Sequence, residues 1–342
     1  MQVDTDKWSE RYRSATLDPR SQRVLVTNLA GTRQECDVSE PLVCNGFGRI
    51  RHFRRAASKG WPENPLPIDP AARALGLDRH FTEVRALVFQ NAACNWRCWY
   101  CFVPFDLLSA HPKTSAWLSA KELVDLYLQE QNHPPVLDLS GGQPELTPEW
   151  VLWVMTELKE RGLEDSVYLW SDDNLSTDYF WRYLSSAEQE FVADYRNYGR
   201  VGCFKGFDEE SFAYNTATTP DVFERQFDLM TRYLASGIDM YAYVTFTAPN
   251  RDRIEEKISR FVDRLQALDF NLPLRTIPLE VQAFSPVLPR LNADHVAAMQ
   301  NQEFAVGAWQ EELAKRFPDD LLHRSIADVP LCYLRRASVV NR

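Results

Sequence analysis

The chain lacks several features that would set it apart from ordinary globular enzymes. It has no run of 18 or more apolar residues, so no transmembrane helix is expected. Its first ten residues contain no apolar signal-peptide core, which predicts a cytoplasmic protein. Basic residues are not in excess, because 38 Lys and Arg stand against 48 Asp and Glu, for a formal net charge of −10. This acidic balance argues against a general nucleic-acid binder.

What is present is a globular composition of 342 residues, 45% hydrophobic and 25% charged. The cysteines give the first sign of chemistry. Their number is odd and the chain is long, so a disulfide framework is a poor interpretation. Three of them form a Cys-x3-Cys-x2-Cys cluster, and the other four show no second cluster of metal-ligand spacing. The seven are Cys36, Cys44, Cys94, Cys98, Cys101, Cys203 and Cys332.

Strand-like and helix-like segments alternate from about residue 82 onward. A capping box over 119–122 and an amphipathic stripe ending at Gly237 mark two of the helices. Such alternation predicts an α/β fold with a parallel sheet, either a partial (β/α)6 barrel or an open doubly wound sheet. The expected strands cover 84–90, 136–140, 167–170, 200–204, 240–246 and 277–284.

Three regions are predicted along the chain. Residues 1–80 form an N-terminal extension with little regular structure, 81–288 the barrel core, and 289–342 a C-terminal helical extension with a helix near 293–315. The extension's basic run 51–55 is interpreted as a solvated face, with a substrate or partner contact as the alternative.

Unusual residues follow the expected strands. The cysteine cluster follows strand one, 141–144 follow strand two, 171–174 follow strand three, and Lys205 follows strand four. Both candidate folds gather ligands at the carboxyl ends of their strands. The sequence therefore predicts one active site at that edge of the sheet.

Three thiolates on one short segment can hold three corners of a metal site. A structural zinc site has four protein ligands, and no fourth Cys or His lies near the triplet in the sequence. A [4Fe–4S] cluster tolerates three protein ligands if an external ligand takes the fourth iron. A zinc or structural site remains the alternative.

The triplet Cys94, Cys98 and Cys101, with Tyr100 before its third member and a strand before its first, resembles the radical S-adenosylmethionine (radical SAM) enzymes. The resemblance covers about residues 85–285 and implies a partial (β/α)6 TIM-like barrel. It implies a [4Fe–4S] cluster and S-adenosylmethionine as cofactors, and a flavodoxin or ferredoxin as electron donor. Reductive cleavage would give a 5′-deoxyadenosyl radical that takes a substrate hydrogen, in an oxidoreductase or lyase reaction.

A second segment, Gly141-Gly142-Gln143-Pro144, resembles the family's Gly-Gly-Glu-Pro loop. In that family the loop takes the methionine ammonium. Gln143 departs from the usual Glu, because an amide keeps an acceptor but loses the charge. The ammonium contact is therefore expected to rest mainly on backbone carbonyls. Taken alone, the segment could be only a turn.

Strands three and four most resemble the activating enzymes of glycyl-radical proteins, through Asp172-Asp173-Asn174 and Phe204-Lys205. The resemblance implies that Lys205 takes the S-adenosylmethionine carboxylate and Asp172 the ribose or a nearby cation. Cys203 departs from the family's Asp, which puts a cation there in doubt. A helix cap and a solvated lysine are the alternatives. Further pocket-lining candidates are Ser171, Asp173, Thr245, Gln282 and Ser285.

Three functional hypotheses follow. The first is a radical SAM enzyme acting on a small molecule in cofactor or natural-product biosynthesis. The second is an activase or modifier of a protein or peptide partner. The third is a non-catalytic protein whose triplet holds zinc. Neither a membrane nor a nucleic acid is expected as a partner.

Overall fold

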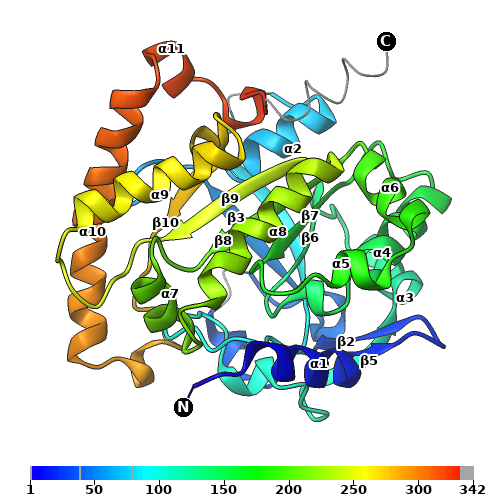
Figure 1. Ribbon diagram of the computed structural model, residues 1–342. Coiled ribbons are helices and arrows are strands. Elements are labelled where there is room, and N and C mark those ends of the chain that lie inside the picture. The colour runs from blue at the N-terminus through cyan, green and yellow to red at the C-terminus, as the bar shows by residue number, and fades with distance from the viewer. Residues whose placement is uncertain (1, 38–39, 79–80, 332–342) are drawn as a thin grey trace.

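The computed structural model of the chain describes residues 2–37, 40–78 and 81–331 (Figure 1). Its main sheet has seven strands in the order β10-β9-β8-β7-β6-β4-β3. Six of them are parallel and follow one another in chain order, and β3 pairs antiparallel with β4. The strands are β3 (Gly48–Arg54), β4 (Glu83–Gln90), β6 (Val136–Ser140), β7 (Tyr168–Asp173), β8 (Tyr198–Phe204), β9 (Met240–Thr245) and β10 (Thr276–Leu279).

This strand order excludes the doubly wound alternative, in which the order reverses at a switch point. An α/β fold with strands in chain order is compatible with part of a barrel. Helices connect the strands, and the predicted capping box at Ser119 and Glu122 begins α3. The helices of this region are α3 (Ala120–Gln129), α4 (Glu149–Glu160), α5 (Tyr179–Tyr183), α6 (Ser186–Asp194), α7 (Glu209–Thr216), α8 (Val222–Ser236), α9 (Ile254–Leu268), α10 (Ala293–Arg316) and α11 (Asp319–Leu322).

The two faces of the sheet have separate cores. The outer face packs Leu137 and Leu139 against the apolar stripes of the connecting helices, including Val154 of α4 and Phe261 of α9. The inner face has its own cluster, in which Tyr168, Trp170 and Val201 pack with α2 (Ile68–Leu75). Helix α2 therefore closes the end of the inner face that lies away from the carboxyl ends of the strands.

The expectation of little regular structure before residue 80 is wrong. This segment contains α1 (Thr5–Thr16), β1 (Leu17–Asp18), β2 (Arg23–Thr27), β3 and α2. Strands β1, β2 and β5 (Ser115–Ser119) form a small second sheet. The basic run that was expected to be a solvated face belongs to β3. Its alternation was hidden because two inward positions, Arg49 and Arg51, carry arginines in place of apolar residues.

The sixth expected strand is also shorter than predicted, since β10 ends at Leu279. Beyond it, Gln302 of α10 binds both backbone groups of Val281 through its side-chain amide, at 3.0 and 2.8 Å. The backbone N–H and C=O of Val281 are thus hydrogen-bonded by a side chain of a helix and not by a neighbouring strand. The C-terminal helix matches its prediction, as α10 begins at Ala293 and ends at Arg316. In the described residues, no helix is long and apolar enough to span a bilayer.

Candidate active site

Strand register decides which predicted residues can meet. Side chains alternate between faces along a strand, and the inner-face cluster includes Ala86, Trp170 and Cys203. Residues two positions along the same strand point to the same face. Asp172 on β7 therefore lies on the inner side with Trp170, and Lys205, just past the end of β8, lies there with Cys203. Ser171 pairs with Leu139 of the outer face and hydrogen-bonds the Tyr198 hydroxyl at 2.7 Å.

The cysteine loop begins directly after β4 and is held by its own backbone. The Cys101 amide donates to the Cys98 carbonyl at 3.0 Å, and the Cys94 amide donates to Leu108 at 3.1 Å. The Arg97 guanidinium donates to the carbonyls of Cys94 and Trp96, at 2.7 and 2.9 Å. All three thiols are free. Cys98 is buried, whereas Cys94 and Cys101 are partly exposed.

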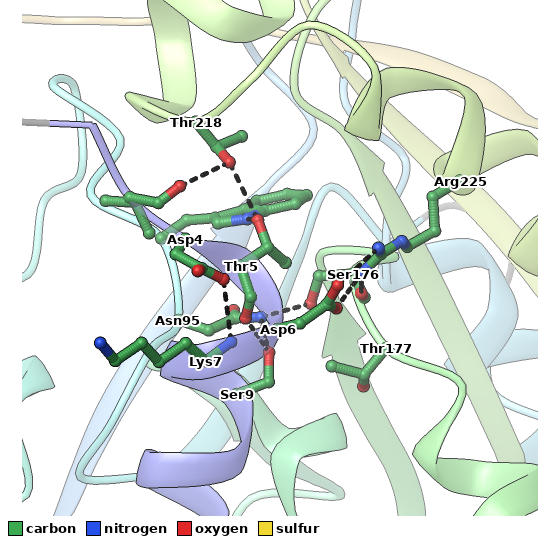
Figure 2. A network of polar contacts seen from close by, with 12 residues as sticks. Asp4, Thr5, Asp6, Lys7, Ser9, Asn95, Ser176, Thr177, Thr218 and Arg225 are labelled. Atoms are coloured by element: carbon green, nitrogen blue, oxygen red, sulfur yellow. Dashed lines mark hydrogen bonds and ion pairs between the residues drawn. The ribbon is translucent and has the colours of Figure 1, made fainter.

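Helix α1 braces this loop from outside (Figure 2). Thr5 accepts a hydrogen bond from the Trp96 indole at 2.9 Å, and Ser9 accepts one from Asn95 at 2.8 Å. Thr5 also bonds Thr218, which links α1 to the connection between α7 and α8. This bracing could not be predicted from the sequence, because the contacts lie about ninety or more residues apart along the chain.

Asn95 connects the loop to the end of strand β7 as well. Its amide donates to the Ser176 hydroxyl at 2.8 Å, and its carbonyl accepts from Asn174 at 2.9 Å. The Asn174 amide also lies 3.9 Å from the Cys94 sulfur. The third residue of the Asp-Asp-Asn segment is thereby brought to the cysteine loop.

The three thiols influence one another electrostatically. Burial raises the pKa of Cys98 to about 12, with Cys94 and Cys101 adding to the rise and Lys205 opposing it. Burial also raises the pKa of Cys94, to which Cys101 adds. For Lys205, burial acts to lower the pKa, but the nearby Cys203, Tyr100 and Cys98 outweigh it and the net pKa is raised. Lys205 is therefore one of the cations that lie near the thiols.

Two aromatic residues of the loop are fixed by polar partners. The Tyr100 hydroxyl hydrogen-bonds Thr245 at the end of β9, at 2.9 Å. The Trp99 indole donates to the Asn215 side chain at 3.0 Å, and the Asn215 amide donates to the Lys205 carbonyl at 2.9 Å. The predicted residues Tyr100, Thr245 and Lys205 are thus brought to the same loop. Asn215 is a site-building residue that sequence reasoning missed.

The Gly-Gly-Gln-Pro loop packs against the start of the cysteine loop. The backbone N–H of Gln143 donates to the Ala93 carbonyl at 2.8 Å. Gly142 has a φ of +144°, and a Cβ there would lie 2.3 Å from the Ala93 oxygen, so only glycine fits. Gly141 has a φ of +74° and packs against Gln90. Pro144 begins the short 3-10 turn Pro144–Leu146.

The Gln143 side chain is committed within the protein. Its amide nitrogen donates to Asp173 at 2.8 Å, and its oxygen accepts from the Asn174 backbone at 3.0 Å. Asp173 also caps the Leu175 amide at 2.7 Å. Gln143 and Asp173 therefore join two strand-end loops. Cofactor roles for Ser171, Asp173 and the Gln143 side chain stay predictions.

The remaining candidates are spread more widely. Asp172 accepts a hydrogen bond from Ser140 at 2.5 Å, on the inner side. Gln282 lies beyond β10, and its side-chain amide donates to the Ser58 hydroxyl at 3.4 Å. Ser285 is exposed. Cys203 is buried on the inner face, and burial raises its pKa to about 12.

Two arginines near the loop were not anticipated. Arg290, which follows the barrel core, donates to the Cys101 carbonyl and lies over the Phe105 ring. Arg49 of β3 is buried, and its guanidinium lies over the Phe102 ring, 4.9 Å from the ring centroid. Arg49 could not be recognised as a site residue from the sequence, because only the pairing of β3 with β4 brings it to the site.

Over residues 2–37, 40–78 and 81–331, no group of three or more His, Cys, Asp and Glu side chains could hold a single metal ion. The thiols of an iron–sulfur cubane each bind a different iron, and Cys94, Cys98 and Cys101 are free thiols on one loop. Cys332 and the Cys36 side chain lie outside the described residues.

No protein-family model and no curated protein matches the chain. Among solved structures it is similar to Streptococcus suis SuiB bound to the precursor peptide SuiA, with 14% identity over 52% of this chain and 36% of SuiB, at a TM-score of 0.38. It is also similar to native anSMEcpe with bound AdoMet, with 14% identity over 66% of this chain and 60% of that one, at a TM-score of 0.38. The chain thus matches under two thirds of either protein. Likenesses this weak bear on neither ligand nor reaction.

Proposed function

We propose that this chain is a radical SAM enzyme that abstracts a hydrogen atom from a small-molecule substrate in cofactor or natural-product biosynthesis. One observation carries the proposal. Three free thiols, Cys94, Cys98 and Cys101, lie on one loop at the carboxyl end of β4. Such a donor set suits a [4Fe–4S] cluster with one iron left for an external ligand.

When bound, this cluster supplies one electron to the sulfonium of S-adenosylmethionine, whose cleavage gives methionine and a 5′-deoxyadenosyl radical. The chain's own residues would position the reactants and exclude water. Trp96 and Trp99 flank Cys98 in the sequence and are both buried, and in this proposal they limit the access of water to the loop. In this proposal Lys205 receives the carboxylate of S-adenosylmethionine, and the Tyr100–Thr245 hydrogen bond fixes the loop against β9.

The methionine ammonium would be received by backbone carbonyls of the Gly141–Gly142 segment. The Gln143 side chain is a poor candidate, because both ends of its amide already have partners. This division of labour agrees with the Gln that replaces the family's Glu. The proposed role of the glycines is to bring the main chain close to the ligand.

The activase hypothesis is the second candidate, and the Asp172–Asn174 segment is the observation that favours it. Asp172 faces the inner side and Asn174 reaches the Cys94 sulfur. In either case a cytoplasmic flavodoxin or ferredoxin would supply the electron. A partner that gains a glycyl radical or a cross-link would favour the activase over the small-molecule enzyme.

The test is anaerobic reconstitution of the full chain with iron and sulfide, followed by reduction with S-adenosylmethionine present. We expect iron and sulfide in equal amounts and formation of 5′-deoxyadenosine. The Cys98→Ala variant should lose both, whereas Cys44→Ala, which alters a buried thiol outside the loop, should keep both. Stoichiometric zinc, or a Cys98→Ala protein that still forms the nucleoside, would overturn the proposal.

A further inference from the structure

The inner face of the sheet carries charged residues that the proposed cofactor sites do not use. In the strand register, Arg49 of β3 pairs with Val88 of β4, and Val88 pairs with Asp138 of β6. All three side chains therefore point inward in one row. Neighbouring strands lie about 4.8 Å apart, so the Cα atoms of Arg49 and Asp138 are separated by roughly 10 Å.

Both charged groups are buried, and each has side-chain polar atoms without a hydrogen-bond partner, although the Arg49 guanidinium also lies over the Phe102 ring, 4.9 Å from its centroid. The Asp138 side chain is 0% exposed, and neither carboxylate oxygen has a hydrogen-bond partner among the described residues. Arg49 is 8% exposed, and its Nε and Nη2 likewise have none. Folding seldom buries a charge without compensation, because removing a charged group from water is costly. Unpaired groups of opposite sign on one inner face indicate a place for a ligand.

Two further charges stand beside this row. Arg51 points inward two residues along β3, lies over the Phe53 ring, and makes no ion pair within the described part of the chain. Asp172 of β7 is close enough to Asp138 to raise the pKa of that carboxyl, although burial is the larger cause. Apart from Lys205, which is assigned to the carboxylate of S-adenosylmethionine, the inner face thus presents two guanidinium groups and two carboxyl groups, whose formal charges cancel.

We propose that Arg49 and Asp138 bind the two ends of a zwitterionic substrate, an amino acid or a small derivative that keeps both its carboxylate and its ammonium. Arg49 takes the carboxylate through its unpartnered N–H groups, and Asp138 takes the ammonium. Because the two arginines and the two aspartates carry equal and opposite formal charges, the ligand that suits them is neutral overall and charged at both ends.

The position of the pair relative to the cysteine loop supports a substrate site. Val88 lies two residues before the end of β4, and the Arg49 guanidinium lies over the ring of Phe102, the residue that follows Cys101. A ligand between Arg49 and Asp138 would therefore lie just below the edge at which the radical is proposed to form. The assignment of this ligand as the substrate rests on the proposed function. Binding of the ligand at Arg49 and Asp138 can be tested separately.

The experiment uses the full chain, reconstituted anaerobically, with each of the twenty common L-amino acids at millimolar concentration, with and without S-adenosylmethionine. The readout is the thermal midpoint. At least one amino acid should raise it by several degrees, and its analogues that lack the amine or the carboxylate should not. Arg49→Gln and Asp138→Asn should each abolish this shift.

Matched controls keep the result specific. Arg54 lies on the same strand, faces the opposite way and pairs with Glu83 at the surface, so Arg54→Gln should keep the ligand-induced shift. Asp125 on α3 forms surface ion pairs, and Asp125→Asn should keep it too. The inference is overturned if no amino acid stabilises the protein, or if the shift survives in Arg49→Gln or Asp138→Asn.

Two outcomes separate this inference from its premise. If the wild type forms 5′-deoxyadenosine but binds no amino acid, the substrate assignment alone fails. If it binds one but never cleaves S-adenosylmethionine, the proposed function fails and the binding site stands. The alternative is that Arg49 and Asp138 interact through a water molecule and only stabilise the fold. In that case each single variant would lower the thermal midpoint of the ligand-free protein, and the double variant would lower it no further. That pattern would also overturn the inference.

Discussion

Replacing Gln143 by Glu restores the residue usual in the family that the loop resembles, and the structure predicts that this chain will not tolerate it. The Gln143 amide nitrogen is a hydrogen-bond donor to Asp173 at 2.8 Å, in a site where both side chains are buried. An ionised Glu cannot donate and would face that carboxylate directly. The substitution therefore exchanges an attraction for a repulsion.

The magnitude follows from two contributions. A hydrogen bond to a charged group is worth about 1.5–3 kcal/mol, and two like charges 4 Å apart repel by about 4 kcal/mol at an effective dielectric constant of 20. Protonation of the new carboxyl limits the sum, so we expect a loss of about 4 kcal/mol in the free energy of unfolding at pH 8. Gln143→Met, which removes the hydrogen bonds without adding a charge, should lose about 2 kcal/mol.

The pH dependence gives a second signature. The new carboxyl has a raised pKa in the folded state, so its stabilising protonated form is fully present below the unfolded pKa of about 4.3 and is lost as the pH rises through the folded value. The deficit of Gln143→Glu should therefore shrink by up to about 1.4 kcal/mol for each unit of pH lowered from 8 toward 5.5. The deficit of Gln143→Met should not change in this way.

Urea unfolding of the metal-free proteins, followed by circular dichroism at several pH values, measures these differences. Gln310→Glu on the exposed side of α10 is the control, which should stay within about 0.5 kcal/mol of wild type. A Gln143→Glu protein that is as stable as wild type at pH 8, or whose deficit does not depend on pH, would contradict this prediction.

Three further results are expected. Asn95→Leu removes the hydrogen bonds that join the cysteine loop to α1 and to the end of β7, so the thermal midpoint should fall by several degrees and reconstituted iron should drop; an unchanged iron content would contradict the bracing role. His52 has a raised pKa because Glu83 and Glu40 accept its hydrogen bonds, against the opposing effect of burial. Its stabilisation is present below pH 6.5 and lost as the pH rises through the folded value, so His52→Asn should cost more stability at pH 6 than at pH 9, and an equal cost by urea unfolding would refute it. Cys101→Ala should lose the iron–sulfur absorbance after reconstitution, and a variant that remains brown would remove Cys101 from the ligand set.

Much of the parallel sheet could be predicted from the sequence, because its signals are local. Apolar runs, the capping box at Ser119 and the stop at Gly237 all act within a few residues. The position of the cysteine loop after β4 was predictable for the same reason. The N-terminal strand was not, since the inward positions Arg49 and Arg51 break the apolar alternation on which such predictions depend.

The polar framework of the site was also beyond the sequence. Its contacts are long-range: Thr5 meets Trp96, Asn215 meets Trp99, and Arg290 meets Cys101. Hydrogen bonds of this kind depend on the three-dimensional arrangement and leave no periodic trace in the chain. The Gln at position 143 was noticed as a departure, but its cause, the donor that Asp173 requires, is visible only in the packed structure.

The central claim is that Cys94, Cys98 and Cys101 hold a cluster whose fourth iron accepts S-adenosylmethionine. Electron paramagnetic resonance of the reduced, reconstituted protein tests it most directly. A [4Fe–4S]⁺ signal that changes when S-adenosylmethionine is added, and that is absent from Cys98→Ala, is the predicted result. A signal that S-adenosylmethionine leaves untouched, or a protein that takes up zinc and shows no signal at all, would contradict it.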